Sequence, residues 1–461
     1  MAKTTRRRDG ITRREFVASA VAASALAGAG GVRGAQAARP NVLYIMADDL
    51  GWGDLSCYGR PDYKTPNLDR LASEGVRFTQ GYAAAPVCTP TRCAFVTGRY
   101  PARTAVGLEE PLAWRRGLVE QKRDPGLPPE HPTVASLLKA AGYHTALVGK
   151  WHLGYLPRYG PVKSGFEEFF GIMSGGADYF THKDANGEGD LFEAEVPVER
   201  VGYMTDLITE RAADYLKRQR RNEPFFLSLC YTAPHWPWEG PRDEPVARAL
   251  PGGYAGFTSG GSLKVYAEMM KSLDEGVGRV LRVLEEAGHA QRTLVVFTSD
   301  NGGERFSYNW PFTGKKFDLH EGGIRVPAFV RWPGTVPAGR TTEQVAVTMD
   351  WTATILAAAG ARPHPDYPLD GVDLLPVMRG RREPFERTLF WRNDVQGAAR
   401  SGRWKYLKED AKTERLFDLQ IDEREQADWR GARGEIFERL KAEYQRWESQ
   451  MLKPRAESAA L

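Results

Sequence analysis

An apolar run, Asn41-Val42-Leu43-Tyr44-Ile45-Met46-Ala47, ends at the polar residues Asp48-Asp49-Leu50-Gly51. A continuous apolar run of this length, closed by glycine, is typical of a strand buried on both faces of a parallel sheet. The same order of apolar run and polar cluster recurs three times further along the chain. The recurrences are 145–148 before Gly149-Lys150-Trp151-His152, 225–229 before Ala233-Pro234-His235, and 293–298 before Ser299-Asp300-Asn301-Gly302.

Helical patterns alternate with these predicted strands, at residues 65–74, 133–141, 204–218 and 265–287. Strands that alternate with helices predict an α/β fold with a large, mostly parallel sheet and helices on both faces. Ligands of such sheets bind beyond the carboxyl ends of the strands. The four polar clusters are therefore expected to converge on one site.

The pattern changes near residue 383. Residues 389–392, 397–408 and 415–419 are typical of short strands, and residues 434–452 of a closing helix. We expect a small C-terminal antiparallel sheet with one helix at 383–461, after a catalytic domain at 38–382. Three polar segments rich in Gly and Pro are predicted to be loops that wall the site: 103–131, 177–197 and 239–261.

Residues 1–37 are typical of an export signal. Arg13-Arg14-Glu15-Phe16 looks like a twin-arginine motif, and Ala35-Gln36-Ala37 fits a cleavage site. The alternative, a membrane anchor, is disfavoured because the apolar run 17–31 is short and rich in Ala and Gly. This segment carries seven basic and two acidic residues, so the rest of the chain has a net charge of −1 and no nucleic-acid partner is indicated. We expect a periplasmic or secreted protein that uses the twin-arginine export machinery.

Oxygen-bearing side chains dominate two of the polar clusters. Asp48, Asp49, Asp300 and Asn301 offer the ligands that suit Ca²⁺ or Mg²⁺ rather than zinc. Such pairs are also common as turn or cap residues. Their position after apolar strands favours a metal site.

A second element of the site is Cys88-Thr89-Pro90-Thr91-Arg92. Thr89 is predicted as a helix N-cap and Pro90 as the first helical residue, which puts Cys88 at a helix N-terminus. Arg92 follows one turn later on the same face, so the pattern indicates a nucleophile that handles anions. The alternative is a disulfide or a buried thiol. The four cysteines (Cys57, Cys88, Cys93 and Cys230) are too few for a disulfide framework.

The pattern C-x-P-x-R followed by T-G resembles the signature of the type I sulfatases of the alkaline phosphatase superfamily. In that family the cysteine is oxidised to formylglycine by a maturation enzyme. Thr91 is a small departure, because bacterial members usually carry Ser there. Residues 142–154 match the second signature, G-Y-x-T-x-x-x-G-K-W-H-L-G, without a departure.

The resemblance implies roles for the residues that match the family motifs. A cation, Ca²⁺ or alternatively Mg²⁺, would be held by Asp48, Asp49, Cys88, Asp300 and Asn301. Lys150 and His152 would bind the formylglycine hydrate and the sulfate, with Arg92 assisting deprotonation. In the weaker motif P-H-x-P, His235 would protonate the departing alcohol. The lysine five residues before E-G-G is Lys316, and Lys315 is the alternative.

The implied chemistry is attack of one hydrate hydroxyl on sulfur, followed by expulsion of sulfate when the second hydroxyl loses its proton. The resemblance thus predicts an arylsulfatase-like sulfuric ester hydrolase acting on an aryl sulfate or a sulfated glycan. The nearest alternative is a phosphonate monoester or phosphodiester hydrolase of the same superfamily. A non-catalytic protein that binds sulfated glycans is disfavoured because every motif position is occupied.

Overall fold

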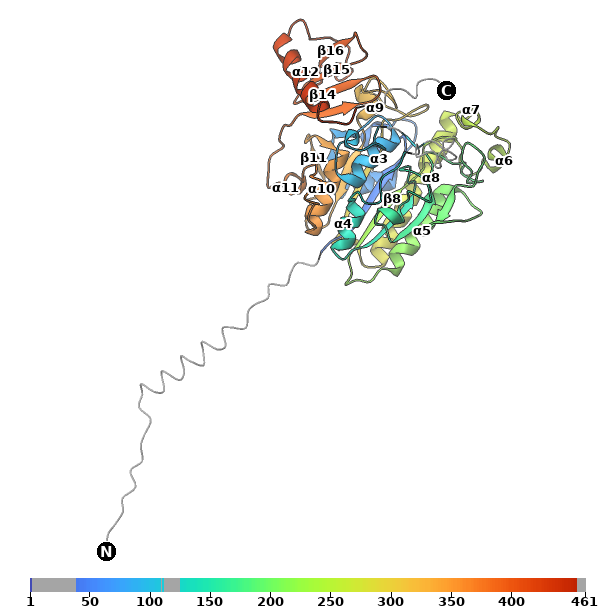
Figure 1. Cartoon of the computed structure of the whole chain (residues 1–461). Helices are drawn as coiled ribbons and strands as arrows, with labels where there is room; N and C mark the ends of the chain where they lie inside the picture. The colour runs from blue at the N-terminus through green and yellow to red at the C-terminus, as the bar shows by residue number, and fades with distance from the viewer. Residues whose placement is uncertain (2–38, 109, 112–124, 454–461) are drawn as a thin grey trace. The chain divides into compact units, whose positions relative to one another are not determined.

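The computed structural model describes residues 1, 39–108, 110–111 and 125–453, and residues 40–461 form one compact unit (Figure 1). The predicted export signal lies outside the described residues apart from Met1. Among the described residues, no helix is both long enough and apolar enough to cross a membrane.

A ten-stranded sheet forms the centre of this unit. Its central strands are parallel neighbours in the order β9-β1-β8-β4-β5, and antiparallel pairs occur toward both edges. The order is β11 (Arg340–Thr342), β2 (Val76–Phe78), β10 (Ala328–Arg331), β9 (Thr293–Ser299), β1 (Asn41–Ala47), β8 (Phe225–Cys230), β4 (His144–Gly149), β5 (Glu168–Ile172), β6 (Leu191–Glu193) and β7 (Val196–Pro197). The predicted α/β class is confirmed, and the four predicted strands are neighbours.

Strand β1 shows why an unbroken apolar run was needed. All seven residues are buried, and alternate side chains point to opposite faces of the sheet. Leu43 and Ile45 pack into the core under one helical layer, whereas Val42 and Tyr44 pack into the core under the other. Both faces of the strand are therefore apolar.

Helices cover both faces of the sheet, as predicted. Helices α5 (Met204–Arg218) and α8 (Leu263–Glu286) contribute to the core on the Leu43 face, and α2 (Pro66–Ser73) contacts α8. Helices α3 (Cys88–Thr97), α4 (Val134–Ala140) and α10 (Thr348–Ala359) cover the Tyr44 face. The Tyr44 ring stacks on Phe95 of α3 at 3.6 Å between centroids, which fixes α3 over the sheet.

The C-terminal sheet lies at one end of the unit (Figure 1). It comprises β13 (Leu389–Arg392), β14 (Gly397–Ser401), β15 (Trp404–Lys408) and β16 (Glu414–Asp418), with α12 (Gly434–Glu448) against it. All its pairings are antiparallel, as predicted. Its core also includes Tyr82, Leu319 and Ile324 from earlier in the chain. The boundary predicted between residues 382 and 383 stays a prediction.

Several predicted bounds need correction. Residues 397–408 form two strands joined at Gly402, whose φ of 57° makes the tight turn, rather than one strand. Helix α12 ends at Glu448, before Leu452. The predicted loop 177–197 contains the edge strands β6 and β7, and the loop 239–261 contains α6 (Glu244–Ala247) and α7 (Tyr254–Phe257). Shorter elements are β3 (Gly81–Tyr82), β12 (Ala346–Val347), α9 (Glu321–Ile324) and α11 (Leu375–Met378).

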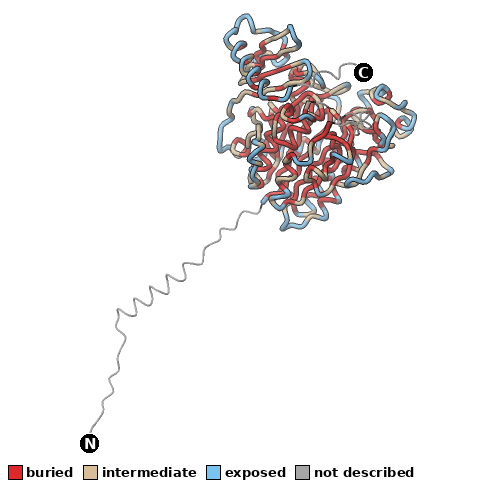
Figure 2. The backbone as a smooth tube through the Cα atoms, in the orientation of Figure 1, coloured by how far each residue is buried: buried red, intermediate tan, exposed pale blue. Residues whose placement is uncertain are grey.

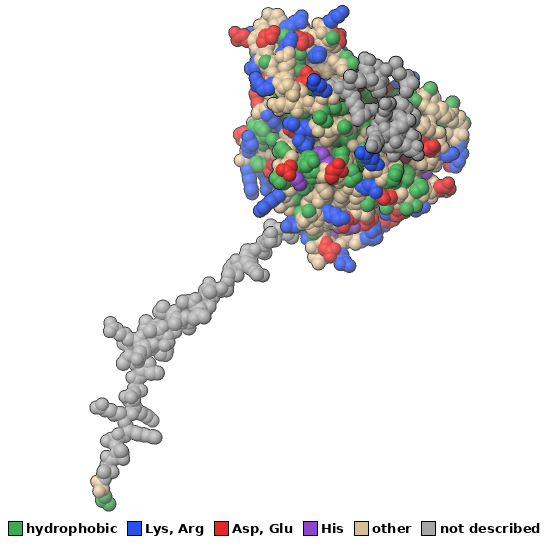
Figure 3. Space-filling view, viewed as in Figure 1, with side chains coloured by type: hydrophobic (Ala, Val, Ile, Leu, Met, Phe, Trp, Pro, Cys, Tyr) green, Lys and Arg blue, Asp and Glu red, His purple; other side chains and the backbone are tan. Residues whose placement is uncertain are grey.

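Burial follows this layering, with buried residues along the strands and exposed residues at the periphery (Figure 2). On the face shown in Figure 3, Lys and Arg side chains lie among Asp and Glu side chains. This mixture agrees with the small net charge of the chain. All four cysteines are free.

Candidate active site

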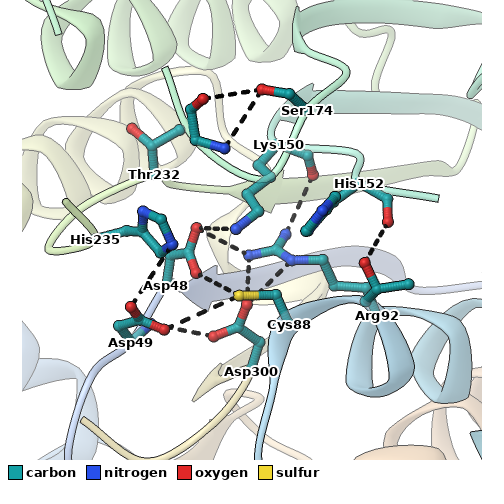
Figure 4. Close-up of polar contacts among 12 residues, drawn as sticks. Asp48, Asp49, Cys88, Arg92, Lys150, His152, Ser174, Thr232, His235 and Asp300 are labelled. Atoms are coloured by element: carbon teal, nitrogen blue, oxygen red, sulfur yellow. Dashed lines mark hydrogen bonds and ion pairs between the residues drawn. The ribbon is translucent and has the colours of Figure 1, made fainter. Parts of the chain in front are cut away.

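The carboxyl ends of four adjacent parallel strands supply most of the candidate site. Asp48 and Asp49 follow β1, and Asp300 and Asn301 follow β9. Beyond β4 and β8 lie Lys150, His152 and His235, so the predicted convergence of the four polar clusters is observed (Figure 4). Parallel neighbours end at the same sheet edge, which is why residues far apart in sequence meet here.

Cys88 is the first residue of α3, and its sulfur points toward Asp48 and Asp49 (Figure 4). The N-cap is Val87, so the prediction that Thr89 caps this helix is wrong. The Thr89 hydroxyl instead donates to the carbonyl oxygen of His152 at 2.9 Å, which ties α3 to the segment after β4. Cys88 nevertheless lies at the helix N-terminus, where the dipole favours negative charge.

Thr91 stands where bacterial family members usually carry Ser, and like Ser it provides a hydroxyl group. Its Oγ1 donates to the carbonyl oxygen of Ala85 at 3.0 Å and accepts from the Ala85 amide at 3.1 Å. The hydroxyl thus holds the chain that leads into α3. Serine and threonine can both make these two bonds.

The Cys88 sulfur lies among carboxylates. Its Sγ is 3.4 Å from Asp48 Oδ1 and 4.0 Å from Asp49 Oδ1. Burial raises the pKa of the Cys88 thiol, and the charge of Asp48 raises it further. The unmodified thiol therefore stays protonated at neutral pH and is a poor nucleophile.

Three cations neutralise the three aspartates. Lys150 Nζ lies 2.6 Å from Asp48 Oδ2, Lys316 Nζ lies 2.9 Å from Asp49 Oδ2, and Arg92 Nη2 lies 2.7 Å from Asp300 Oδ2. All six side chains are buried. Burial by itself lowers the pKa of both lysines, but the adjacent carboxylates outweigh it and raise their pKa above the usual value. Both lysines therefore remain charged and can attract an anion.

The structure separates the two candidate lysines. Lys316 is buried against Asp49, whereas Lys315 is exposed. Lys316 therefore belongs to the site and Lys315 does not contact it. The five-residue spacing to Glu321 thus selected the lysine that is buried beside Asp49, and its role in the site stays a prediction.

The two histidines have different surroundings. His235 Nδ1 donates to the carbonyl oxygen of Trp236 at 2.6 Å, which turns Nε2 toward Asp49 Oδ2 at 3.7 Å. Both ring nitrogens of His152 are buried and lack a hydrogen-bond partner among the described residues. Burial, together with nearby lysine charges, lowers the pKa of both histidines well below the usual value. His152 is consequently neutral, and both its ring nitrogens are open to a ligand.

Two site residues have a strained backbone. Asp49 and His152 have φ angles of 62° and 54°, in the left-handed region that non-glycine residues seldom occupy. Gly149, with φ of 112°, is required because a Cβ there would collide with the carbonyl of Cys230. That close approach lets the Lys150 amide donate to the Cys230 carbonyl at 2.8 Å. The structure therefore requires glycine at position 149, directly before Lys150.

The donor set fits a hard divalent cation. One ligand atom each from Asp48, Asp49, Cys88 and His235 lies within 4.8 Å of the others. Asn301 Nδ2 donates to Asp49 Oδ1 at 2.7 Å, and Asn301 Oδ1 is buried without a partner among the described residues. Such an unsatisfied buried oxygen is costly unless a ligand completes its coordination. Carboxylate and amide oxygens are the ligands that Ca²⁺ prefers.

The Sulfatase family model matches residues 40–361, about 70% of the chain and all the site residues described above. The chain belongs to the sulfatase family. N-acetylgalactosamine-6-sulfatase of Homo sapiens is 36% identical over 384 residues, which are 79% of this chain and 71% of that protein. The predicted family is thereby confirmed, and the protein is a sulfuric ester hydrolase.

Solved structures agree with the fold of this sulfatase. The crystal structure of Ps i-CgsB in complex with k-i-k-neocarrahexaose is 30% identical, with a TM-score of 0.80, and covers 90% of this chain and 94% of that chain. The phosphonate monoester hydrolase of Agrobacterium radiobacter is 21% identical, with a TM-score of 0.63 over 89% of this chain and 96% of that chain. At that identity the likeness shows a shared fold alone.

One residue of the sulfatase site was not predicted from the sequence. Glu110 lies in the segment 103–131, whose composition indicated only a loop. Its carboxylate accepts from the Thr89 amide at 3.4 Å and lies within 4.8 Å of ligand atoms of Cys88 and His152. No spacing or motif marks it, so only the tertiary structure could reveal it.

Proposed function

We propose that this sulfatase hydrolyses aryl or carbohydrate sulfates with Cys88, converted to formylglycine, as the nucleophile. The position of Cys88 carries the proposal, because its sulfur lies beside Asp48 and Asp49 at the start of α3. The family generally uses a formylglycine residue and a metal ion. The raised pKa of the unmodified thiol supports the need for modification, since a protonated thiol attacks poorly.

Asp48, Asp49, Asp300, Asn301 and modified Cys88 would hold the cation, Ca²⁺ or alternatively Mg²⁺. When bound, that ion would lower the pKa of the nucleophile and offset sulfate charge.

The remaining residues act on the substrate through charge and proton transfer. Lys150 and Lys316 are buried cations that would bind sulfate oxygens and stabilise the negative charge of the transition state. His152 would accept the proton lost from the nucleophilic residue, because both its ring nitrogens lack partners among the described residues. His235 would donate a proton from Nε2 to the departing oxygen once the negative charge of a bound sulfate favours the protonated ring, and Arg92 would hold Asp300 in place.

Mass spectrometry of the tryptic peptide 78–92 tests the nucleophile. Protein made in a host with a formylglycine-generating enzyme should carry an aldehyde at Cys88, and Cys88→Ala should remove sulfate release while the protein stays folded. Fully active protein that holds only a thiol at Cys88 would refute the assignment. Release rates from sulfate, phosphonate and phosphodiester substrates then separate a sulfatase from a phosphonate or phosphodiester hydrolase.

Thermal unfolding with and without Ca²⁺ tests the cation site. A ligand that binds only the folded state raises the Tm, so Ca²⁺ should stabilise the wild type and fail to stabilise Asp300→Asn. Asp214→Asn, a change on the exposed face of α5, should keep the full rise. An equal rise in all three proteins would contradict the site.

We infer that the twin-arginine export machinery is a further partner and that the enzyme acts in the periplasm or outside the cell. The pair Arg13-Arg14 supports this route. Replacement of both by Lys should leave the precursor in the cytoplasm. Cell fractionation measures where the double variant accumulates, and its normal accumulation outside the cytoplasm would contradict this export route.

A further inference from the structure

Two aromatic rings lie close to Lys316, and a third packs on one of them. The Lys316 Nζ is 5.9 Å from the centroid of the Trp236 ring and 5.5 Å from that of the Phe317 ring. Tyr254 of α7 meets Trp236 edge to face, with centroids 5.3 Å apart. These three rings, Trp236, Tyr254 and Phe317, are called the aromatic walls below.

The aromatic walls are open to solvent although the charged centre is not. Tyr254 is 61% exposed and Phe317 is 54% exposed, whereas Lys316 is 4% exposed. Large apolar rings that stay in water beside a buried polar centre are typical of a ligand-binding surface. Phe317 in particular offers an exposed ring whose centroid lies 5.5 Å from the buried Lys316 Nζ.

Phe317 is held in a conformation that an aromatic residue rarely adopts. Its φ is 75°, in the left-handed region where glycine is at ease. The Phe317 amide donates to the Pro86 carbonyl at 2.8 Å, and Asn393 Nδ2 donates to the Phe317 carbonyl at 3.0 Å. Strain of this kind is found where a side chain must face a ligand.

One unsatisfied acceptor and a second carboxylate accompany the aromatic walls. The Oε2 atom of Glu304 is buried and has no hydrogen-bond partner among the described residues. Glu110 lies beside Cys88 and His152, and the charges of both glutamates act on the Tyr254 hydroxyl. Buried or partly buried carboxylates call for donors, which the hydroxyl groups of a ligand supply.

We propose that Trp236, Tyr254 and Phe317 bind the sugar ring that carries the sulfate, and that Glu110 and Glu304 accept hydrogen bonds from its hydroxyls. This inference rests on the proposed function and names its substrate class. A pyranose has an apolar C–H face, which packs on an aromatic ring, and a polar edge, which needs acceptors. An aryl or steryl group would cover the rings but leave the Glu304 Oε2 atom without a donor.

Phe317→Gly gives the sharpest test, because it removes the ring and relieves the strained backbone together. For galactose 6-sulfate or N-acetylgalactosamine 6-sulfate, whichever the wild type hydrolyses faster, we expect KM to rise about 10-fold with kcat little changed. The Tm should stay equal or rise, because glycine suits this φ. A residue with a purely structural role would instead lower the Tm and leave KM unchanged.

Tyr254→Phe and Trp310→Ala complete the comparison. Tyr254→Phe keeps the ring but loses the hydroxyl. It should therefore raise the KM for sugar sulfates about 3-fold and leave the KM for 4-nitrophenyl sulfate unchanged. Trp310 is 53% exposed in the same loop as Phe317, but its ring contacts Arg424. Trp310→Ala should therefore change the KM for neither substrate.

Calorimetric binding of the same sugar sulfates to Cys88→Ala protein separates this inference from the proposed function. Binding that Phe317→Gly weakens supports the aromatic walls even where no sulfate is released. Equal losses for sugar sulfates and 4-nitrophenyl sulfate would overturn the sugar assignment, because the rings would then accept any flat group. Unchanged binding and KM in both Phe317→Gly and Tyr254→Ala would overturn the subsite itself.

Discussion

Lys316 and Lys315 are adjacent in sequence, yet only Lys316 is buried against Asp49. Loss of a buried charge that stabilises a transition state typically costs ~10²–10³-fold in rate. We expect Lys316→Ala to lower kcat/KM for 4-nitrophenyl sulfate by about 10²-fold or more, and Lys315→Ala to change it less than about 2-fold. Comparable losses in the two variants, measured on folded protein, would rule out the assignment.

His235 offers a test of proton donation that does not depend on the nucleophile. General acid assistance contributes ~10²–10⁴-fold and matters most for a basic leaving group. His235→Ala should therefore damage hydrolysis of a sugar sulfate far more than hydrolysis of 4-nitrophenyl sulfate, whose phenolate departs unaided. A residue that only holds the sulfate group would slow both substrates equally, so equal losses in kcat/KM would exclude His235 as the acid.

Ion pairs of a lysine in β15 join the C-terminal sheet to the site. Lys405 of β15 is fully buried, with its Nζ 2.9 Å from Glu321 Oε1 and 2.8 Å from Glu425 Oε1. Glu321 opens α9, five residues after Lys316, and its amide donates to Glu425 Oε2 at 2.6 Å. The C-terminal sheet thus fixes the segment that carries Lys316.

Lys405→Met should be strongly destabilising, because it removes the cation that two buried carboxylates share, of which only Glu321 keeps a second cation, Arg325. Removal of one partner of a buried ion pair typically costs ~3–5 kcal/mol. Urea unfolding measures the loss, and Lys408→Met at the half-buried end of the same strand should cost less than about 1 kcal/mol. Adding Glu425→Gln to Lys405→Met should recover part of the stability, and strict additivity of the two changes would contradict the network.

The stability of the whole molecule should depend on pH through Glu239. Glu239 is 1% exposed, and burial together with the charge of Asp178 raises its pKa to about 9. An unfolded glutamate titrates near ~4.3, so between these values the folded state holds a proton that the unfolded state lacks. Stability from this group is complete below the unfolded pKa and falls as the pH rises toward 9.

Glu239→Gln should reduce the loss of folding stability as the pH rises. The largest slope that one proton can give is about 1.4 kcal/mol per pH unit, so urea unfolding at pH 6, 7 and 8 resolves the difference. Glu244→Gln, on the exposed surface of α6, should follow the wild type. If Glu239→Gln loses stability with pH as steeply as the wild type, Glu239 is ionised in the folded protein.

Element type could be predicted wherever the pattern was strongly periodic. Strand β1 and helix α5 have the predicted bounds, because six consecutive apolar residues at 42–47 and a regular amphipathic face leave few alternatives. The hairpin within 397–408 was missed because the turn at Gly402 is short and both strands read as one run. The start of α3 was misjudged because the Thr89 hydroxyl bonds to His152, a contact between distant parts of the chain.

The sequence alone determined the family, the strands that meet at the site and the residue types of the site, since each is written in a local pattern. Only the tertiary structure decided that Glu110 lies near Cys88, that Lys316 lies within 6 Å of two aromatic rings, and that Lys405 supports α9. These contacts join residues from different loops and sheets, and no periodic pattern along the chain predicts which distant side chains will be in contact. Tertiary packing determines these contacts, because a buried charge or an exposed ring is tolerated only where its neighbours compensate for it.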